Sequence, residues 1–100
     1  CACLGPCLYV PYEPLGPETG VELIIVRNGE KVFSDSTSLS EMKRTPEELV
    51  GFLFRETSFS SGVFLMTGTG IVPGSDFTLQ SGDEVSIAID SIGVLTNPVR

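Results

Sequence analysis

The sequence predicts a largely antiparallel, rolled sheet or barrel covered by one helix. Three observations lead to this mainly β (α+β) fold class. Apolar runs of strand length dominate the chain, glycine-containing turns join neighbouring runs, and a single segment shows helical periodicity. With 100 residues, of which 41% are hydrophobic, the chain can bury a core as one domain.

The first element expected is a short strand that leads into a winding loop over residues 1–20. Glycine and proline interrupt regular structure here, at Gly5, Pro6, Pro11, Pro14, Gly16, Pro17 and Gly20. A β-hairpin is predicted over residues 21–34, where two strand-like runs flank Asn28 and Gly29. Asn-Gly is the preferred pair for a type I′ turn because both central positions need a positive φ.

One helix is predicted over residues 45–57. Thr45 can cap it, Pro46 suits the first helical position, and Glu48 completes a Thr-x-x-Glu capping box. The segment carries an apolar stripe at helical spacing, formed by Leu49, Val50, Leu53 and Phe54. This stripe predicts that the helix packs against the sheet.

Strands are expected to resume over residues 63–99. The runs with strand character are 63–67, 77–79, 84–90 and 92–96. The turns between the later runs are marked by Gly82-Asp83 and Asp90-Ser91.

The acidic composition argues against several partners. Thirteen acids against six bases give a net charge of -7, so we expect neither nucleic-acid binding nor association with anionic lipids. No apolar run approaches the roughly 20 residues of a membrane span, and we expect a soluble protein. The sequence has no histidine, which excludes a Ser-His-Asp relay or an HExxH zinc site within it. We expect Lys43 and Arg44 to lie in a solvated loop, and a local anion clamp is the alternative.

The cysteines Cys1, Cys3 and Cys7 lie at the start of the chain. A closed zinc or iron–sulfur site usually needs four ligands, so buried free thiols are expected instead. An odd number of cysteines without a secretory segment fits a reducing compartment, and we expect a cytoplasmic protein. Because the chain begins with Cys1 rather than methionine, we interpret it as a C-terminal piece.

A loop of glycines and hydroxyls is the main candidate for a binding site. It contains Thr67, Gly68, Thr69 and Gly70, and follows an apolar run. The glycines let the backbone approach a ligand, while amide N–H groups and threonine hydroxyls can donate to a carboxylate or phosphate. The alternative is that this segment is only the exit of a strand.

A series of motifs follows along nearly the whole chain: Leu4-Gly5-Pro6, Asn28-Gly29-Glu30, residues 46–53, Thr67-Gly68-Thr69, Leu79-x-x-Gly82-Asp83-x-Val85, and Ile92-Gly93-x-Leu95-x-Asn97-Pro98-Val99. In this order they resemble the C-terminal half of the fumarylacetoacetate hydrolase family. Residues 66–73, with residues 41–44 ahead of them, resemble the branch of 2-keto-3-deoxy sugar-acid (arabinonate) dehydratases. Gly70 stands where acylpyruvate hydrolases usually carry a proline.

The resemblance implies a magnesium-dependent enzyme that acts on a small 2-oxo acid and assembles as a homodimer or larger homo-oligomer. The expected reaction is dehydration of a 2-keto-3-deoxy sugar acid, and the alternative is C–C bond hydrolysis of an acylpyruvate. By position in the family motif, Thr69 touches the substrate. Thr67, Gly68 and Gly70 complete the expected substrate-binding set.

The resemblance also implies that the metal ligands lie upstream of this chain. Family members hold Mg²⁺ with Asp and Glu residues, supported by a lysine, that precede the segment matching Leu4-Gly5-Pro6. We therefore assign no catalytic and no metal-binding residue within residues 1–100, which would be part of a larger catalytic domain. The sheet should then be incomplete and the chain alone inactive. A non-catalytic binding or assembly module is the alternative of a different class.

Overall fold

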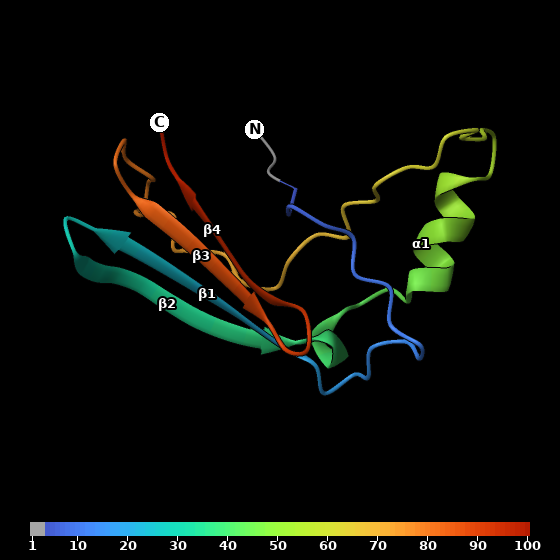
Figure 1. The fold of residues 1–100 in the computed structure, drawn as a ribbon, viewed down its shortest axis with the longest axis horizontal. Coiled ribbons are helices and arrows are strands. Elements are labelled where there is room, and N and C mark those ends of the chain that lie inside the picture. The colour runs from blue at the N-terminus through green and yellow to red at the C-terminus, as the bar shows by residue number, and fades with distance from the viewer. Residues whose placement is uncertain (1–3) are drawn as a thin grey trace.

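A computed structural model describes residues 4–100 (Figure 1). Its elements are β1 (Gly20–Arg27), β2 (Glu30–Ser38), the 3₁₀ helix η1 (Leu39–Glu41), α1 (Pro46–Leu53), β3 (Glu84–Ile89) and β4 (Gly93–Pro98). Four strands and one α-helix confirm the mainly β fold class.

The hairpin of β1 and β2 forms around the predicted turn. Asn28 and Gly29 have φ values of 52° and 80°, as a type I′ turn requires. The strands pair from Arg27↔Glu30 to Gly20↔Ser38, with an irregularity between Ile25 and Val26. The second strand therefore continues to Ser38, past the predicted end at residue 34.

All four strands form one antiparallel sheet in the order β2-β1-β3-β4. The edge strands β2 and β4 are not paired with each other, so the sheet is open. This confirms the expectation of an incomplete sheet rather than a closed barrel.

The register places most large apolar side chains on one face of the sheet. Partnered positions on this face are Val21, Leu23, Ile25, Phe33, Val85, Ile87, Ile89 and Leu95. Hydroxyl side chains gather on the opposite face, where Ser86 Oγ and Thr96 Oγ1 lie 2.8 Å apart. Ile25, in the central strand β1, is only 2% exposed and marks the core.

The segment from residue 70 to residue 80 covers this apolar face. A Cβ at Gly70 would lie 3.5 Å from Thr37 Oγ1, near the end of β2. Farther along, the ring of Phe77 lies 5.8 Å from that of Phe33. Arg27 then donates from Nη2 to the carbonyl of Thr78 at 3.0 Å. The segment therefore runs along the hairpin toward its turn.

The capping box of α1 is present, but the expected packing of the helix is wrong. Thr45 Oγ1 accepts from the Glu48 amide at 3.2 Å, and Glu48 Oε2 accepts from the Thr45 amide at 2.8 Å. No helix residue is buried, and Phe52 is 58% exposed. The helix stands apart from the sheet (Figure 1), because residues 70–80 occupy the apolar face that the stripe was expected to cover.

The helix also ends at Leu53, not at residue 57. The amide of Arg55 donates to the carbonyl of Phe52, a shorter-range bond than the i→i−4 bond of an α-helix. A last turn that buries no side chain gains little stability from tertiary packing, so the helix stops early.

Three predicted strands do not form. Residues 63–67 have no regular structure and stay exposed, because no described strand lies beside them to complete a ladder. Residues 77–79 instead follow a turn in which the Phe77 amide bonds to the Gly74 carbonyl. In the first segment no strand begins before Gly20 within residues 4–20, and the rest of that prediction falls outside the described residues.

Cys7 is exposed, which corrects the expectation of a buried thiol at that position. Its backbone lies in the irregular first segment, where residues 4–10 are all exposed. The expectations for Cys1 and Cys3 fall outside the described residues. Within residues 4–100, no helix has the length and apolar character needed to span a membrane.

Candidate functional site

A groove of about 700 Å³ lies at the end of the sheet where β1 begins and β2 ends. Its walls come from the strand ends, the segment between β2 and α1, and the glycine-rich loop of residues 67–70. The polar residues used below are Thr37, Ser38, Glu41, Lys43 and Arg44. A volume of this size falls within the range of pockets for small ligands.

All four residues predicted to bind substrate line this groove. Gly68 has a φ of 85°, in the left-handed region that glycine adopts without strain. Gly70 lies close to Thr37, so the loop returns to the sheet there. The structure thus brings Thr67, Gly68, Thr69 and Gly70 to one surface. Their contact with a substrate stays a prediction.

The hydroxyl of Thr69 is fixed by the backbone that follows it. Its Oγ1 accepts from the amide of Ile71 at 3.0 Å, and Ile71 is 5% exposed. The buried isoleucine anchors the loop to the core, while Thr69 itself is exposed. Because Oγ1 accepts this bond, its own hydrogen is left to donate to a ligand oxygen.

The loop also presents unused backbone donors. Within residues 4–100, no backbone hydrogen bond uses an amide of residues 67–70. Successive free N–H groups around a glycine with positive φ can surround an anion oxygen. The sequence suggested this donor set, and the structure adds the groove into which it opens.

Two cations line the same groove. Lys43 and Arg44 are both exposed, and neither forms a salt bridge with a described residue. Among the described residues of this lining, Glu41 is the one acid. The sequence favoured a solvated loop for this pair. Both side chains are exposed, as that expectation requires, and their position beside residues 67–70 also allows an anion clamp.

Thr37 and Ser38 are groove residues that the sequence did not single out. They belong to the last positions of β2, and the Oγ atoms of Ser38 and Ser40 lie 2.6 Å apart. A hydroxyl-rich strand end was the available signal. Its significance depended on which loop would lie beside it, and the sequence does not show that pairing.

Asp83, predicted only to mark a turn, is fully buried. Its two carboxylate oxygens accept from Arg27 Nε and Nη2, each at 2.7 Å, and Oδ2 also accepts from the Gln80 amide at 2.8 Å. These bonds, with that from Arg27 first in size, lower the pKa of Asp83 to about 2. The same pairing raises the pKa of Arg27.

Arg27 joins three parts of the fold near the hairpin turn. It pairs with Asp83, bonds to the carbonyl of Thr78, and lies 5.7 Å from the centre of the Phe77 ring. These contacts attach the far end of the covering segment to β1. The pair therefore fixes the segment whose other end carries the 67–70 loop.

The described residues do not make a metal site. Within residues 4–100, no group of three or more His, Cys, Asp or Glu side chains lies close enough to hold a metal ion. Glu41 is the single carboxylate of the groove lining, and Asp83 is already occupied by Arg27. Magnesium prefers several oxygen ligands, which these carboxylates do not supply together.

Comparison with known proteins adds to this geometry. Residues 1–100 match the family described as fumarylacetoacetate (FAA) hydrolase C-terminal. The chain belongs to this family. In this member of the family, the described residues form the open sheet and the glycine-rich groove.

Two dehydratases are similar to this family member over nearly its entire length. A probable 2-keto-3-deoxyxylonate dehydratase of Haloferax volcanii is 39% identical over 100 residues, covering 99% of this chain and 35% of the relative. The 2-dehydro-3-deoxy-D-arabinonate dehydratase of Saccharolobus solfataricus is 38% identical over 101 residues, covering 100% and 34%. The chain thus spans about a third of the length of these relatives.

One part of a solved structure has the fold of this chain. It is a 2-keto-3-deoxy-D-arabinonate dehydratase complexed with magnesium and 2,5-dioxopentanoate, with a TM-score of 0.82 and 38% identity. The match covers 90% of this chain and 31% of that structure's chain. The fold of this family member therefore corresponds to one part of a larger dehydratase.

Proposed function

We propose that this chain is part of a magnesium-dependent enzyme that removes water from a 2-keto-3-deoxy sugar acid. The observation that supports this most is the groove, in which Thr67, Gly68, Thr69 and Gly70 open beside two cations. The identity of 38–39% to dehydratases of such acids supports dehydration as the reaction. The ligands of magnesium would come from a region that corresponds to the part of the relatives not matched by this chain.

Dehydration of such an acid takes a proton from the carbon beside the ketone and expels the neighbouring hydroxyl group. Negative charge develops on the keto oxygen during this step, and bound magnesium supplies a positive charge that stabilises it. The residues of this chain bind and orient the acid. Thr69 Oγ1 donates to a substrate oxygen, and the free amides of the 67–70 loop donate beside it.

The replacement Thr69→Ala tests this assignment in the intact protein. We expect kcat/KM for 2-keto-3-deoxyarabinonate with magnesium to fall about 10- to 100-fold, because a hydrogen bond to a charged substrate is lost. Thr69→Ser keeps the hydroxyl and should retain most of the activity. An unchanged rate in Thr69→Ala would contradict the role of this residue, and a wild-type protein that releases no water would contradict the reaction.

Product analysis separates dehydration from hydrolysis of an acylpyruvate. Dehydration leaves the carbon chain whole, whereas C–C hydrolysis releases two smaller acids. A protein that catalyses neither reaction would fit the non-catalytic module. A homodimer or larger assembly and a cytoplasmic location stay predictions, tested by sedimentation of the intact protein and by localisation in cells.

A further inference from the structure

The groove carries two cationic side chains in addition to the neutral donors of its glycine-rich loop. Lys43 and Arg44 are neighbours in sequence and both line it. They are two of only six bases in a chain that carries thirteen acids. Of the other bases, Arg27 is paired with Asp83 and Arg55 lies 4.7 Å from the centre of the Phe52 ring. Two adjacent cations in one groove are therefore a local reversal of the chain's net charge.

Among the described residues, no acid pairs with either of these cations. Neither forms a salt bridge within residues 4–100, and Glu41 is the single acid in the groove lining. Two positive charges and one negative charge leave the lining with an excess of one positive charge. A groove lined by one sign of charge attracts ligands of the opposite sign.

The loop and the cations offer two different kinds of binding group. The 67–70 loop presents neutral donors, which suit the oxygens of the 2-oxo acid end. Lys43 and Arg44 present full charges from a separate segment, between η1 and α1. Charge-assisted hydrogen bonds from lysine and arginine to carboxylate or phosphate are roughly twice as strong as neutral ones.

We propose that Lys43 and Arg44 determine specificity by binding a second anionic group, so that the groove prefers 2-oxo acids with a negatively charged far end. This inference rests on the proposed function only for the placement of the 2-oxo end at the 67–70 loop. The second group is a carboxylate or a phosphate, since both accept the same bonds from these side chains.

A matched pair of ligands tests this without any turnover. 2-Oxoglutarate and 2-oxopentanoate have the same carbon chain and differ in whether the far end is a carboxylate or a methyl group. Calorimetry on the intact protein with magnesium should give a Kd about 10-fold or more lower for 2-oxoglutarate. The double variant K43M/R44M should lose that preference while its Kd for 2-oxopentanoate changes less than about twofold.

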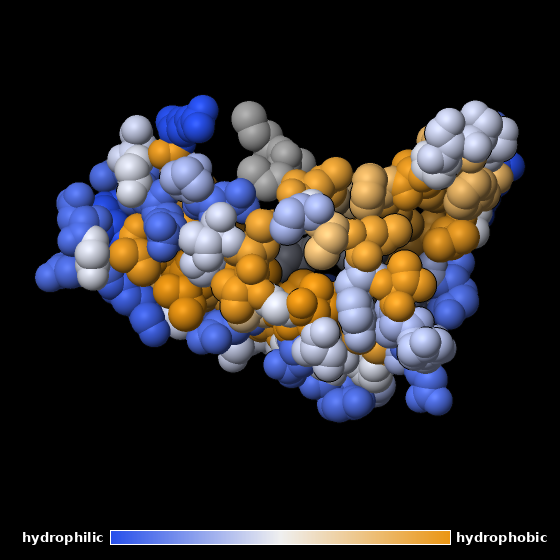
Figure 2. All heavy atoms as spheres, in the orientation of Figure 1, coloured by the Kyte–Doolittle hydropathy of each residue, from blue (hydrophilic) through white to orange (hydrophobic). Residues whose placement is uncertain are grey.

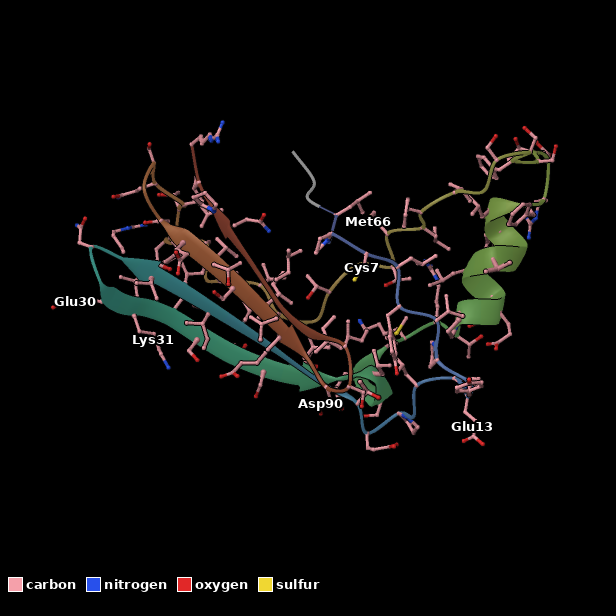
Figure 3. All side chains as sticks on the ribbon, in the orientation of Figure 1. Cys7, Glu13, Glu30, Lys31, Met66 and Asp90 are labelled. Carbon is pink, nitrogen blue, oxygen red and sulfur yellow. The ribbon has the colours of Figure 1, made fainter. Side chains whose placement is uncertain are left out.

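Two variants serve as controls. Lys31→Met removes the same charge from the exposed turn end of β2, far from the groove (Figure 3), and should leave both Kd values unchanged. Glu41→Gln removes the acid of the groove and should raise the preference for 2-oxoglutarate. Raising the salt concentration from 50 to 200 mM should weaken the binding of 2-oxoglutarate more than the binding of 2-oxopentanoate.

A second pair identifies the anionic group. 2-Keto-3-deoxy-6-phosphogluconate carries a phosphate where 2-keto-3-deoxygluconate carries a hydroxyl. The ratio of Kd values within this pair is compared with the ratio for 2-oxopentanoate and 2-oxoglutarate. If the phosphate pair gives the larger ratio, and that ratio disappears in K43M/R44M, the second group is a phosphate. If the phosphate pair gives the smaller ratio, the second group is a carboxylate.

Three results would overturn the inference. The two ligands of each pair could bind with equal affinity, or K43M/R44M could lose the same affinity for both ligands of a pair. The protein could also fail to bind 2-oxoglutarate. Failure of the proposed function looks different, because the charge preference would then be present in a protein that dehydrates neither sugar acid. Conversely, dehydration without any charge preference would leave the proposed function standing and reject the role of Lys43 and Arg44.

Discussion

At the scale of single residues, the salt bridge between Arg27 and Asp83 joins separate parts of the fold through a buried carboxylate. A fully buried carboxylate would be costly without a partner, and here it accepts from a guanidinium and a backbone amide. The pair joins β1 to the residue just before β3 and to the covering segment. A change at either partner should therefore loosen more than one element.

Asp83→Asn should destabilise the protein and change its response to acid. The folded pKa of Asp83 is about 2, below the ordinary value of 3.8, so its ionised form stabilises the fold above about pH 4. That contribution is lost as the pH falls toward 2. We expect the midpoint of thermal unfolding at pH 7 to fall by at least about 5 °C. Between pH 5 and pH 2 the stability of the variant should change less than that of the wild type.

The matched control is Asp35→Asn, since Asp35 is exposed on β2 and, within residues 4–100, accepts from the adjacent Ser36 amide alone. Thermal unfolding followed by circular dichroism across this pH range measures all three proteins. If Asp83→Asn and Asp35→Asn behaved alike, the buried pair would not be the source of the acid response.

At the scale of secondary-structure elements, local signals were predictable and pairing was not. The Asn28-Gly29 turn and the Thr45 capping box depend on neighbouring residues, and both form as predicted. The apolar run 63–67 has strand character, but a strand also needs a partner, which the described chain does not place beside it. The stripe of α1 failed for a related reason, because the sequence does not state which surface a stripe will meet.

The candidate site divides in the same way. Residues 67–70 could be identified from composition, because glycines and hydroxyls have recognisable backbone and donor properties. Their proximity to Thr37, Lys43 and Arg44 comes from the fold. The burial of Asp83 was also beyond the sequence, since an acid after a glycine in a turn is usually exposed.

Thr45→Ala should cost about 1 kcal/mol of helix stability, because the Glu48 amide loses its side-chain acceptor. Thr45→Ser keeps an acceptor and should cost much less. Hydrogen–deuterium exchange of the α1 amides measures the effect directly, since no residue of α1 is buried and we expect the helix to open locally. Equal exchange in the alanine and serine variants would show that the cap does not limit helix opening.

At the scale of the whole molecule, the described chain leaves much apolar surface uncovered. Figure 2 shows hydrophobic atoms extending from the sheet across to α1. Large hydrophobic residues that stay exposed include Val50, Phe52, Phe64 and Met66. Contiguous apolar patches of this kind mark surfaces that bind other protein surfaces. The 100-residue chain therefore has a surface that favours association.

We expect the 100-residue chain by itself to associate in solution. Analytical ultracentrifugation should give a mass that rises with concentration, and the dye 8-anilinonaphthalene-1-sulfonate should bind. Replacing Phe52 and Phe64 by serine should reduce both effects, because these exposed rings contribute to the apolar surface. Replacing the exposed polar residues Ser34 and Ser36 by alanine is the control. A compact monomer that binds no dye would contradict this expectation.

The glycine-rich loop has a kinetic property that follows from its unused amides. Donors that take part in no backbone bond within the described chain should exchange their hydrogens with solvent nearly as fast as an unfolded peptide. The Ile71 amide, bonded to Thr69 and belonging to a buried residue, should exchange more slowly. A bound acid would slow amide exchange at residues 67–70 while leaving the rate at residue 71 nearly unchanged. The exchange rates of the individual amides would therefore report whether the groove is occupied.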